Sequence, residues 1–149
     1  MGTTTFTGPI KAGDVLDTTG SSVGSIKNVG FCVMAQTSVV TQASSATTIV
    51  LPAGSQILSI DLNVLTAWDG VATTLGVGTT VSATQFTAAG AVDGADVGIV
   101  SAAPGTNAPR ASAWVDVGTS DVKIAVTSTN TGSGAGYITV TYIQAANNI

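Results

Sequence analysis

The segment 56–67, QILSIDLNVLTA, decides the fold of this 149-residue chain. Apolar residues occupy every second position from Leu58 to Val64, and polar residues occupy the positions between them. This alternation is typical of a half-buried β-strand, with one face in a core and the other toward water or a partner. We therefore expect Leu58, Ile60, Leu62 and Val64 to point into the core of a β domain.

Shorter segments with β-branched residues or the same alternation lie on both sides of this strand. They predict further strands at 31–40, 47–51, 73–81, 97–100, 112–117, 122–127 and 137–144. We expect the last two to form a hairpin across the glycine-rich loop 130–136, and a short helix is considered only at 82–89. Short strands at this spacing predict an all-β fold, a single antiparallel β-sandwich or jelly-roll-like domain.

The composition argues against several classes of partner. Only 8% of the residues are charged, the net charge is −4, and the chain has no histidine. An acidic chain of this kind has no basic surface for phosphates, so we expect no nucleic-acid partner. The long uncharged stretches 28–60 and 124–149 are interrupted by glycine or proline, so we expect no membrane helix.

The low charge itself has two interpretations. Soluble domains average about 25% charged residues, and the cores of protein interfaces are depleted of charge. The first interpretation is therefore a surface largely covered in an assembly. The second is a soluble β domain that is merely rich in threonine and serine.

No residue is assigned to catalysis, to a cofactor or to a metal, and we expect the protein not to be an enzyme. The lone Cys32 cannot form an intrachain disulfide and is expected to be a small buried side chain. Asp93 and Asp96 flank a glycine turn but supply too few oxygens for calcium, so we expect a solvated turn. The loop 132–136 resembles a phosphate-binding loop only in its glycine content.

The first 28 residues differ from the rest, because their scattered apolar residues show no period. We expect 1–28 to be an extended N-terminal arm and 29–149 to be the β domain. An arm without an apolar face cannot order itself on its own domain, and is suited to lying on a neighbouring subunit. The alternative is a disordered tail without a role. The residues of the arm predicted to contact a partner are Phe6, Pro9, Ile10 and Lys11.

Three further residues are candidates for the core or for an interface. Trp68 ends the strong strand beside a turn, so we expect it in the core. Trp114 shares its predicted face with Asp116, which favours partial exposure or an interface. Trp114 and Arg110, one of only four basic residues, complete the candidate partner-binding set.

Four short segments of the chain also resemble a known family. They are 3–13 (TTTFTGPIKAG), 51–58 (LPAGSQIL), 66–70 (TAWDG) and 74–79 (TLGVGT). They resemble small structural proteins of tailed bacteriophages, notably cyanophage-like ones, and in particular capsid decoration or cement proteins.

The resemblance implies a viral structural protein with a β-sandwich or jelly-roll fold and no catalytic residues. It implies a homotrimer on the outer capsid surface of the virion, made in the host cytoplasm, that clamps neighbouring major capsid protein subunits and so stabilises the phage head. The alternative is a head-fibre or tail-fibre module that binds a host receptor or glycan.

Overall fold

The computed structural model describes residues 32–128 and 130–144, and the predicted arm 1–28 lies outside this range. Eight strands and one helix lie within the described part. They are β1 Cys32–Thr41, β2 Ser45–Leu51, β3 Gln56–Thr66, β4 Thr74–Gly78, β5 Val92–Asp93, β6 Gly98–Ala102, α1 Ala108–Val115, β7 Val122–Ser128 and β8 Ala135–Gln144. The side chain of Cys32 is also outside the described part.

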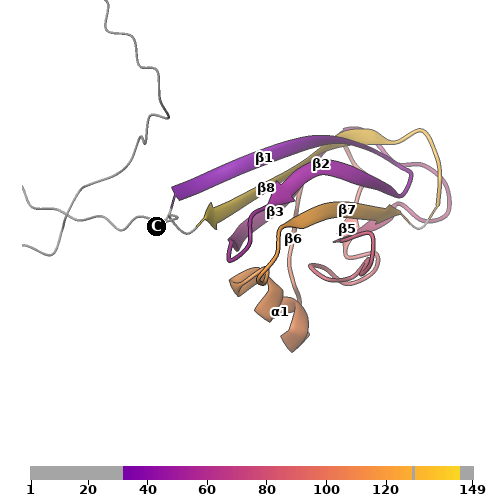
Figure 1. Ribbon diagram of the computed structural model, residues 1–149. Coiled ribbons are helices and arrows are strands. Elements are labelled where there is room, and N and C mark those ends of the chain that lie inside the picture. The colour runs from indigo at the N-terminus through magenta and orange to yellow at the C-terminus, as the bar shows by residue number, and fades with distance from the viewer. Residues whose placement is uncertain (1–31, 129, 145–149) are drawn as a thin grey trace, which may run out of the picture. The chain divides into compact units, whose positions relative to one another are not determined.

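The strands form two four-stranded sheets. Sheet 1 has the order β1-β8-β3-β6, and sheet 2 has the order β2-β7-β4-β5. Figure 1 shows the two sheets as layers, with α1 beside them. Most connections lead from one sheet to the other, so neighbours in the sequence are seldom neighbours in a sheet. The prediction of an all-β sandwich is confirmed.

The strong strand of the sequence is the centre of sheet 1. β3 pairs antiparallel with β8 on one side and with β6 on the other. Ile60, Leu62 and Val64 are buried as predicted, but Leu58 is 45% exposed. A register shift between Ile57 and Ser59 is the reason, since a β-bulge moves the following side chains to the other face. Ile57 takes the place of Leu58 in the core.

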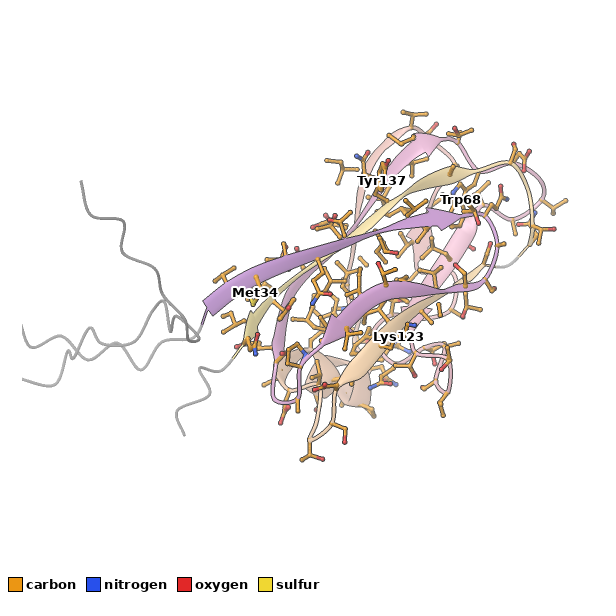
Figure 2. The ribbon with its side chains drawn as sticks, turned by 45° about the horizontal axis from the view of Figure 1, so that its top comes forward. Met34, Trp68, Lys123 and Tyr137 are labelled. Atoms are coloured by element: carbon orange, nitrogen blue, oxygen red, sulfur yellow. The ribbon has the colours of Figure 1, made fainter. Side chains whose placement is uncertain are left out.

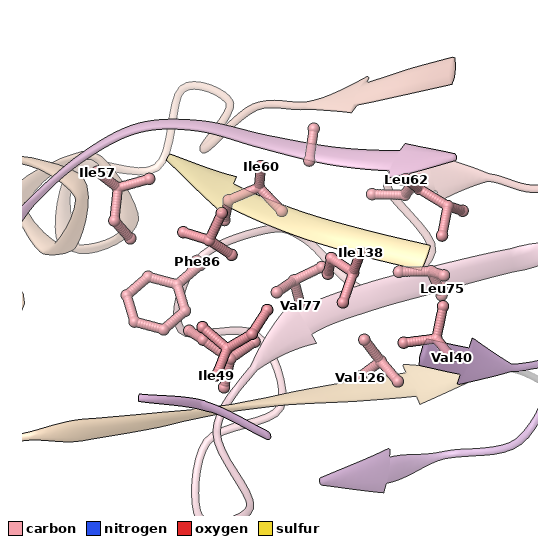
Figure 3. Close-up of a cluster of buried hydrophobic side chains, with 14 of the residues drawn as sticks. Val40, Ile49, Ile57, Ile60, Leu62, Leu75, Val77, Phe86, Val126 and Ile138 are labelled. Carbon is pink, nitrogen blue, oxygen red and sulfur yellow. The ribbon is translucent and has the colours of Figure 1, made fainter. Parts of the chain in front are cut away.

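The core lies between the two sheets, where side chains from both layers interdigitate. Figure 3 shows Ile60 and Ile138 of sheet 1 facing Val77 and Val126 of sheet 2. Each of these four side chains is at most 2% exposed. Phe86, which belongs to no strand, is completely buried in the same cluster.

Side chains join the edge strands β1 and β2, which belong to different sheets. The Gln36 Nε2 group donates to the Val50 carbonyl (2.7 Å), and Gln36 Oε1 accepts from the Val50 N–H (3.1 Å). Gln36 Nε2 also donates to Tyr142 Oη (2.7 Å), and Ser38 Oγ accepts from the Thr48 N–H (3.2 Å). These bonds satisfy backbone groups of an edge strand, which would otherwise be open to pairing with another chain.

The prediction of a strand at 112–117 is wrong, because most of this segment belongs to α1. The Asn107 side chain caps the helix by accepting from the Arg110 N–H (3.1 Å), and Pro109 lies in the first turn. Both residue types favour a helix start. The helix gives way to extended backbone at Asp116. Capping and a first-turn proline therefore prevailed over a short alternating pattern.

The predicted hairpin of 122–127 and 137–144 is also wrong. Both segments are strands, β7 and β8, but they lie in different sheets. The glycine-rich connection between them passes the indole of Trp68, where a Cβ on Gly134 would clash with the ring. Trp68 is buried, as expected, and the glycine permits the close approach.

A loop covers part of the outer face of sheet 2. β4 ends at Gly78, three residues before the predicted end, and residues 82–89 form turns rather than the short helix that was considered. A Cβ at Gly76 or Gly78 would meet the backbone of this loop, so both glycines serve close packing. Among the described residues, no helix has the length and apolar character needed to cross a membrane.

Candidate partner-binding site

The structure places two of the six predicted partner-binding residues. Arg110 and Trp114 both lie on α1, four residues apart. The other four, Phe6, Pro9, Ile10 and Lys11, belong to the part of the chain outside the described residues.

Arg110 lines an open groove beside the start of α1. Its Nε donates to the Pro104 carbonyl (2.9 Å), which holds the guanidinium over the preceding loop. In the described part of the chain, no carboxylate pairs with this guanidinium. The groove has a volume of about 320 Å³ and is lined by Ser82, Thr84, Gln85, Asn107, Pro109 and Arg110. Hydroxyl, amide and guanidinium groups suit a polar or anionic ligand.

Trp114 connects α1 to the loop that covers sheet 2. Its Nε1 donates to the Phe86 carbonyl (2.8 Å), and its ring packs against the hydrophobic core. The side chain is half-buried, as expected, although a helix and not a strand presents it. Trp114 therefore holds the helix in place and leaves only part of its ring for a partner.

The outer face of sheet 1 carries exposed side chains on all four of its strands. A row of polar side chains crosses all four of its strands. Thr37 Oγ1 of β1 lies 2.9 Å from Thr139 Oγ1 of β8, and Thr139 pairs with Asp61 of β3. Asp61 pairs with Ser101 of β6, and its carboxylate accepts from the hydroxyls of Ser101 (2.6 Å) and Ser59 (2.8 Å). The one carboxylate on this face therefore has two donors.

A second row, one step further along the strands, is apolar at both ends. Asn63 of β3 pairs with Tyr137 of β8 and with Ile99 of β6. Thr37 of β1 lies opposite Thr139 of β8. Val39, two residues further along β1, therefore lies beside Tyr137, two residues back along β8. Val39, Ile99 and nearby Leu65 are 65%, 73% and 54% exposed. Figure 2 shows Tyr137 and Lys123 on opposite sides of the sandwich, Lys123 being on sheet 2.

The alternation in the sequence predicted that one face of β3 meets water or a partner, but not which side chains share it. The face combines strands that begin at residues 32, 56, 98 and 135. We call it the sheet 1 face, and define it by Val39, Leu65, Ile99 and Tyr137 with the polar row Thr37, Asp61, Ser101 and Thr139.

At one end of the sandwich, the buried Gln42 side chain joins two loops. Its Oε1 accepts from the N–H groups of Asp69 (2.9 Å) and Gly134 (3.2 Å), and its Nε2 donates to the Asp69 carbonyl. The Ser133 hydroxyl and N–H donate to the Asp69 carboxylate, and these bonds lower the pKa of Asp69 below its ordinary value. The glycine-rich loop is thus used for packing and for binding Asp69.

The other acidic turn is held by its own hydrogen bonds. Asp93 Oδ1 accepts from Thr73 Oγ1 (2.7 Å) and from the Ala95 N–H (3.0 Å). Both Asp93 and Asp96 are exposed, as expected for a solvated turn. Among the described residues, no three His, Cys, Asp or Glu side chains come together as a metal site.

Comparison with models of protein families finds no match, and comparison with curated proteins finds none. Among solved structures, a chain of the "Cyanophage Pam1 capsid asymmetric unit" is 24% identical over 76% of this chain and 86% of that chain. The TM-score of this pair is 0.43. A TM-score of this size establishes neither a shared fold nor a shared role.

Proposed function

We propose that this protein is a viral structural protein, a capsid decoration or cement protein of a tailed bacteriophage. It binds the outer capsid surface and stabilises the head by clamping neighbouring major capsid protein subunits. The observation that carries the proposal is the sheet 1 face, because its four strands contain one charged residue, Asp61. A broad, nearly uncharged surface that remains open on an acidic domain is typical of a protein that works in an assembly.

The segments that resemble decoration proteins support the proposal in a second way. Residues 51–58 form the turn between β2 and β3, residues 66–70 follow β3 around Trp68, and residues 74–79 form β4. These three segments build the scaffold of the two sheets, and the fourth, 3–13, lies outside the described residues. We also propose a protein without enzymatic activity or cofactor, with no nucleic-acid or membrane partner, which is made in the host cytoplasm and becomes part of the virion.

The topology supports a jelly roll. The orders β1-β8-β3-β6 and β2-β7-β4-β5 place eight strands in two sheets, and every connection except the one from β4 to β5 leads from one sheet to the other. Jelly rolls of this kind build viral capsid and lectin domains. Because one fold serves both, the fold alone does not choose between a capsid role and sugar binding.

The second candidate, a fibre module that binds a host receptor or glycan, is favoured by the groove at Arg110. Its lining of hydroxyl, amide and guanidinium groups could bind sugar hydroxyls or a sugar carboxylate. We place the fibre module second because the groove is smaller than the sheet 1 face and is open to solvent.

The test uses purified full-length protein and empty, expanded heads of the phage that carries this gene. We expect the protein to sediment with the heads and to raise their thermal unfolding temperature. Bovine serum albumin at the same concentration is the control for unspecific sedimentation. Heads that neither bind the protein nor gain stability would contradict the proposal, and binding to host cells or glycans instead would support the fibre module.

We also propose that the protein is a homotrimer, as the resemblance implies, and that the arm contacts a neighbouring copy or the capsid. Sedimentation at micromolar concentration without capsids should show self-association, and a monomer would contradict the homotrimer. Deletion of residues 2–13 removes Phe6, Pro9, Ile10 and Lys11 and should leave the β domain folded but weaken attachment to heads. If the truncated protein decorates and stabilises heads as well as the full chain, the proposed role of the arm is wrong.

A further inference from the structure

We propose that the groove beside the start of α1 binds a sugar that carries a carboxylate, and that Arg110 pairs with this carboxylate. The site is additional to the proposed capsid role, which needs no ligand in the groove, and it gives the second candidate function a defined class of ligand. Three features of the groove carry the inference: its fixed walls, its unpaired donors and its single positive charge.

Hydrogen bonds hold both walls of the groove in place without a ligand. One wall belongs to the loop after β4, where the Ser82 carbonyl accepts from the Gln85 N–H (3.2 Å). The other wall is the start of α1, which Asn107 caps by accepting from the Arg110 N–H (3.1 Å). The Trp114 indole ties this helix to the same loop by donating to a loop carbonyl (2.8 Å). A preformed site loses little conformational freedom on binding, so it can hold a small ligand.

Several donors in the lining have no acceptor among the described residues. Asn107 Oδ1 accepts from the Arg110 N–H, so the Nδ2 group of the same amide is left to donate to a ligand. Gln85 Oε1 accepts from Thr79 Oγ1 (3.3 Å), which in the same way leaves Gln85 Nε2. Arg110 uses Nε for the Pro104 carbonyl and keeps both Nη groups. A ligand rich in acceptor oxygens fits this lining.

The charge of the groove selects a single carboxylate. Arg110 is one of two basic residues in the described part of the chain, and none of the six aspartates described there lines the groove. A planar guanidinium binds the two oxygens of a carboxylate through two parallel hydrogen bonds. It balances the single charge of a carboxylate, whereas a phosphate monoester carries about −1.5 to −2 at neutral pH. The acidic domain would repel the excess charge of the phosphate.

The rest of the lining selects a sugar over an acidic side chain of a protein. Hydroxyl and amide groups are spread along the groove, and of the lining residues only Pro109 lacks a polar side chain. The apolar stem of an aspartate or glutamate would leave these groups unpaired, whereas a sugar ring has hydroxyls around its whole edge. The volume of about 320 Å³ is near the lower end of the range for small-ligand sites, about 300–1,000 Å³, and suits a single ring with its substituents.

The position of the groove agrees with the proposed capsid role. Gly78 follows the buried Val77 on β4, so it lies on the outer face of sheet 2. A Cβ at Gly78 would meet the backbone of Ser82, so this wall of the groove lies over that outer face, away from the sheet 1 face. A protein bound to the capsid through the sheet 1 face would keep the groove open to molecules outside the virion. This outward position rests on the proposed function, whereas sugar binding itself does not.

The experiment is a titration of the full-length protein with D-glucuronate, followed by NMR of the ligand, with D-glucose as the uncharged matched ligand. We expect glucuronate to bind at least tenfold more tightly than glucose, and Arg110→Gln to weaken glucuronate binding at least tenfold. Lys123→Gln is the matched control, because it removes the other basic side chain of the described part, on β7 and outside the groove. This control should bind glucuronate as the unchanged protein does.

A second variant tests the groove without changing its charge. Gln85→Met removes the free amide donor, keeps a side chain of similar size, and should weaken glucuronate binding roughly threefold or more. Circular dichroism shows whether each variant is folded. Because Gln85 lies outside α1, Gln85→Met remains informative even if Arg110→Gln unfolds.

Three results would overturn the inference: no binding of glucuronate by the unchanged protein, equal binding of glucose and glucuronate, or equal loss in Arg110→Gln and Lys123→Gln. Acetate that binds as tightly as glucuronate would overturn the assignment to a sugar and favour an acidic side chain of a protein partner. Binding of heads is measured separately. Failure of the groove therefore leaves the capsid role standing, and failure to bind heads leaves the sugar site standing.

Discussion

Replacing Gln42 by leucine tests whether one buried amide holds together the loops at the end of the sandwich. The Gln42 side chain is completely buried and bonds to backbone groups of Asp69 and Gly134. Leucine has a similar size and no polar atoms, so Gln42→Leu removes these hydrogen bonds and leaves little empty space. The loss of stability therefore reports the hydrogen bonds rather than a cavity.

The magnitude follows from what replaces each bond. Gly134 is buried, so its N–H loses its Gln42 acceptor without gaining water, at a cost of about 1–3 kcal/mol. Asp69 is exposed, so water can replace the amide at its N–H and carbonyl, and each bond contributes about 0.5–1.5 kcal/mol. We expect Gln42→Leu to lower the free energy of unfolding by about 2–6 kcal/mol. This is a large part of the total stability of a typical domain, about 5–15 kcal/mol.

The assay is equilibrium unfolding in urea, followed by tryptophan fluorescence, because the buried Trp68 lies beside the same loop. Gln56→Leu is the matched control, since Gln56 is exposed on β3 and its change should stay within about 0.5 kcal/mol. If Gln42→Leu is as stable as this control, the amide does not hold the loops and our reasoning is refuted.

Three further substitutions test other contacts. Asp69→Asn should lower stability at neutral pH, because the Ser133 bonds lower the pKa of Asp69 in the folded protein. This stabilisation is lost as the pH falls through that lowered pKa. The difference in urea unfolding between Asp69→Asn and the unchanged protein should therefore vanish in acid. Gly78→Ala should lower the thermal unfolding temperature, because its Cβ would meet the backbone of the following loop, and an unchanged temperature would contradict this packing. Trp114→Phe keeps an aromatic ring but loses the bond to the Phe86 carbonyl, and should cost about 1 kcal/mol in urea unfolding; no loss would show that the bond is unimportant.

Local patterns in the sequence predicted the class of fold and most of its strands. The alternation in β3 placed Ile60, Leu62 and Val64 in the core, because side chains of a strand point alternately to its two faces. It failed at Leu58, since a bulge depends on the pairing with β8 and leaves no mark in the alternation itself. The alternation failed again at α1. The sequence contains the Asn107 cap and a proline in the first turn, but we gave more weight to a short alternating run.

The sequence by itself determined a charge-poor, all-β chain, with Trp68 in its core and few groups for chemistry. Only the tertiary structure decided which strands share a sheet, and hence that Val39, Asn63, Ile99 and Tyr137 lie in one row. The physical reason is that alternation fixes the two faces of a single strand, whereas strand order is set by long-range pairing and packing. A surface made from four distant segments therefore has no local signal, and it exists only once the sheets have formed.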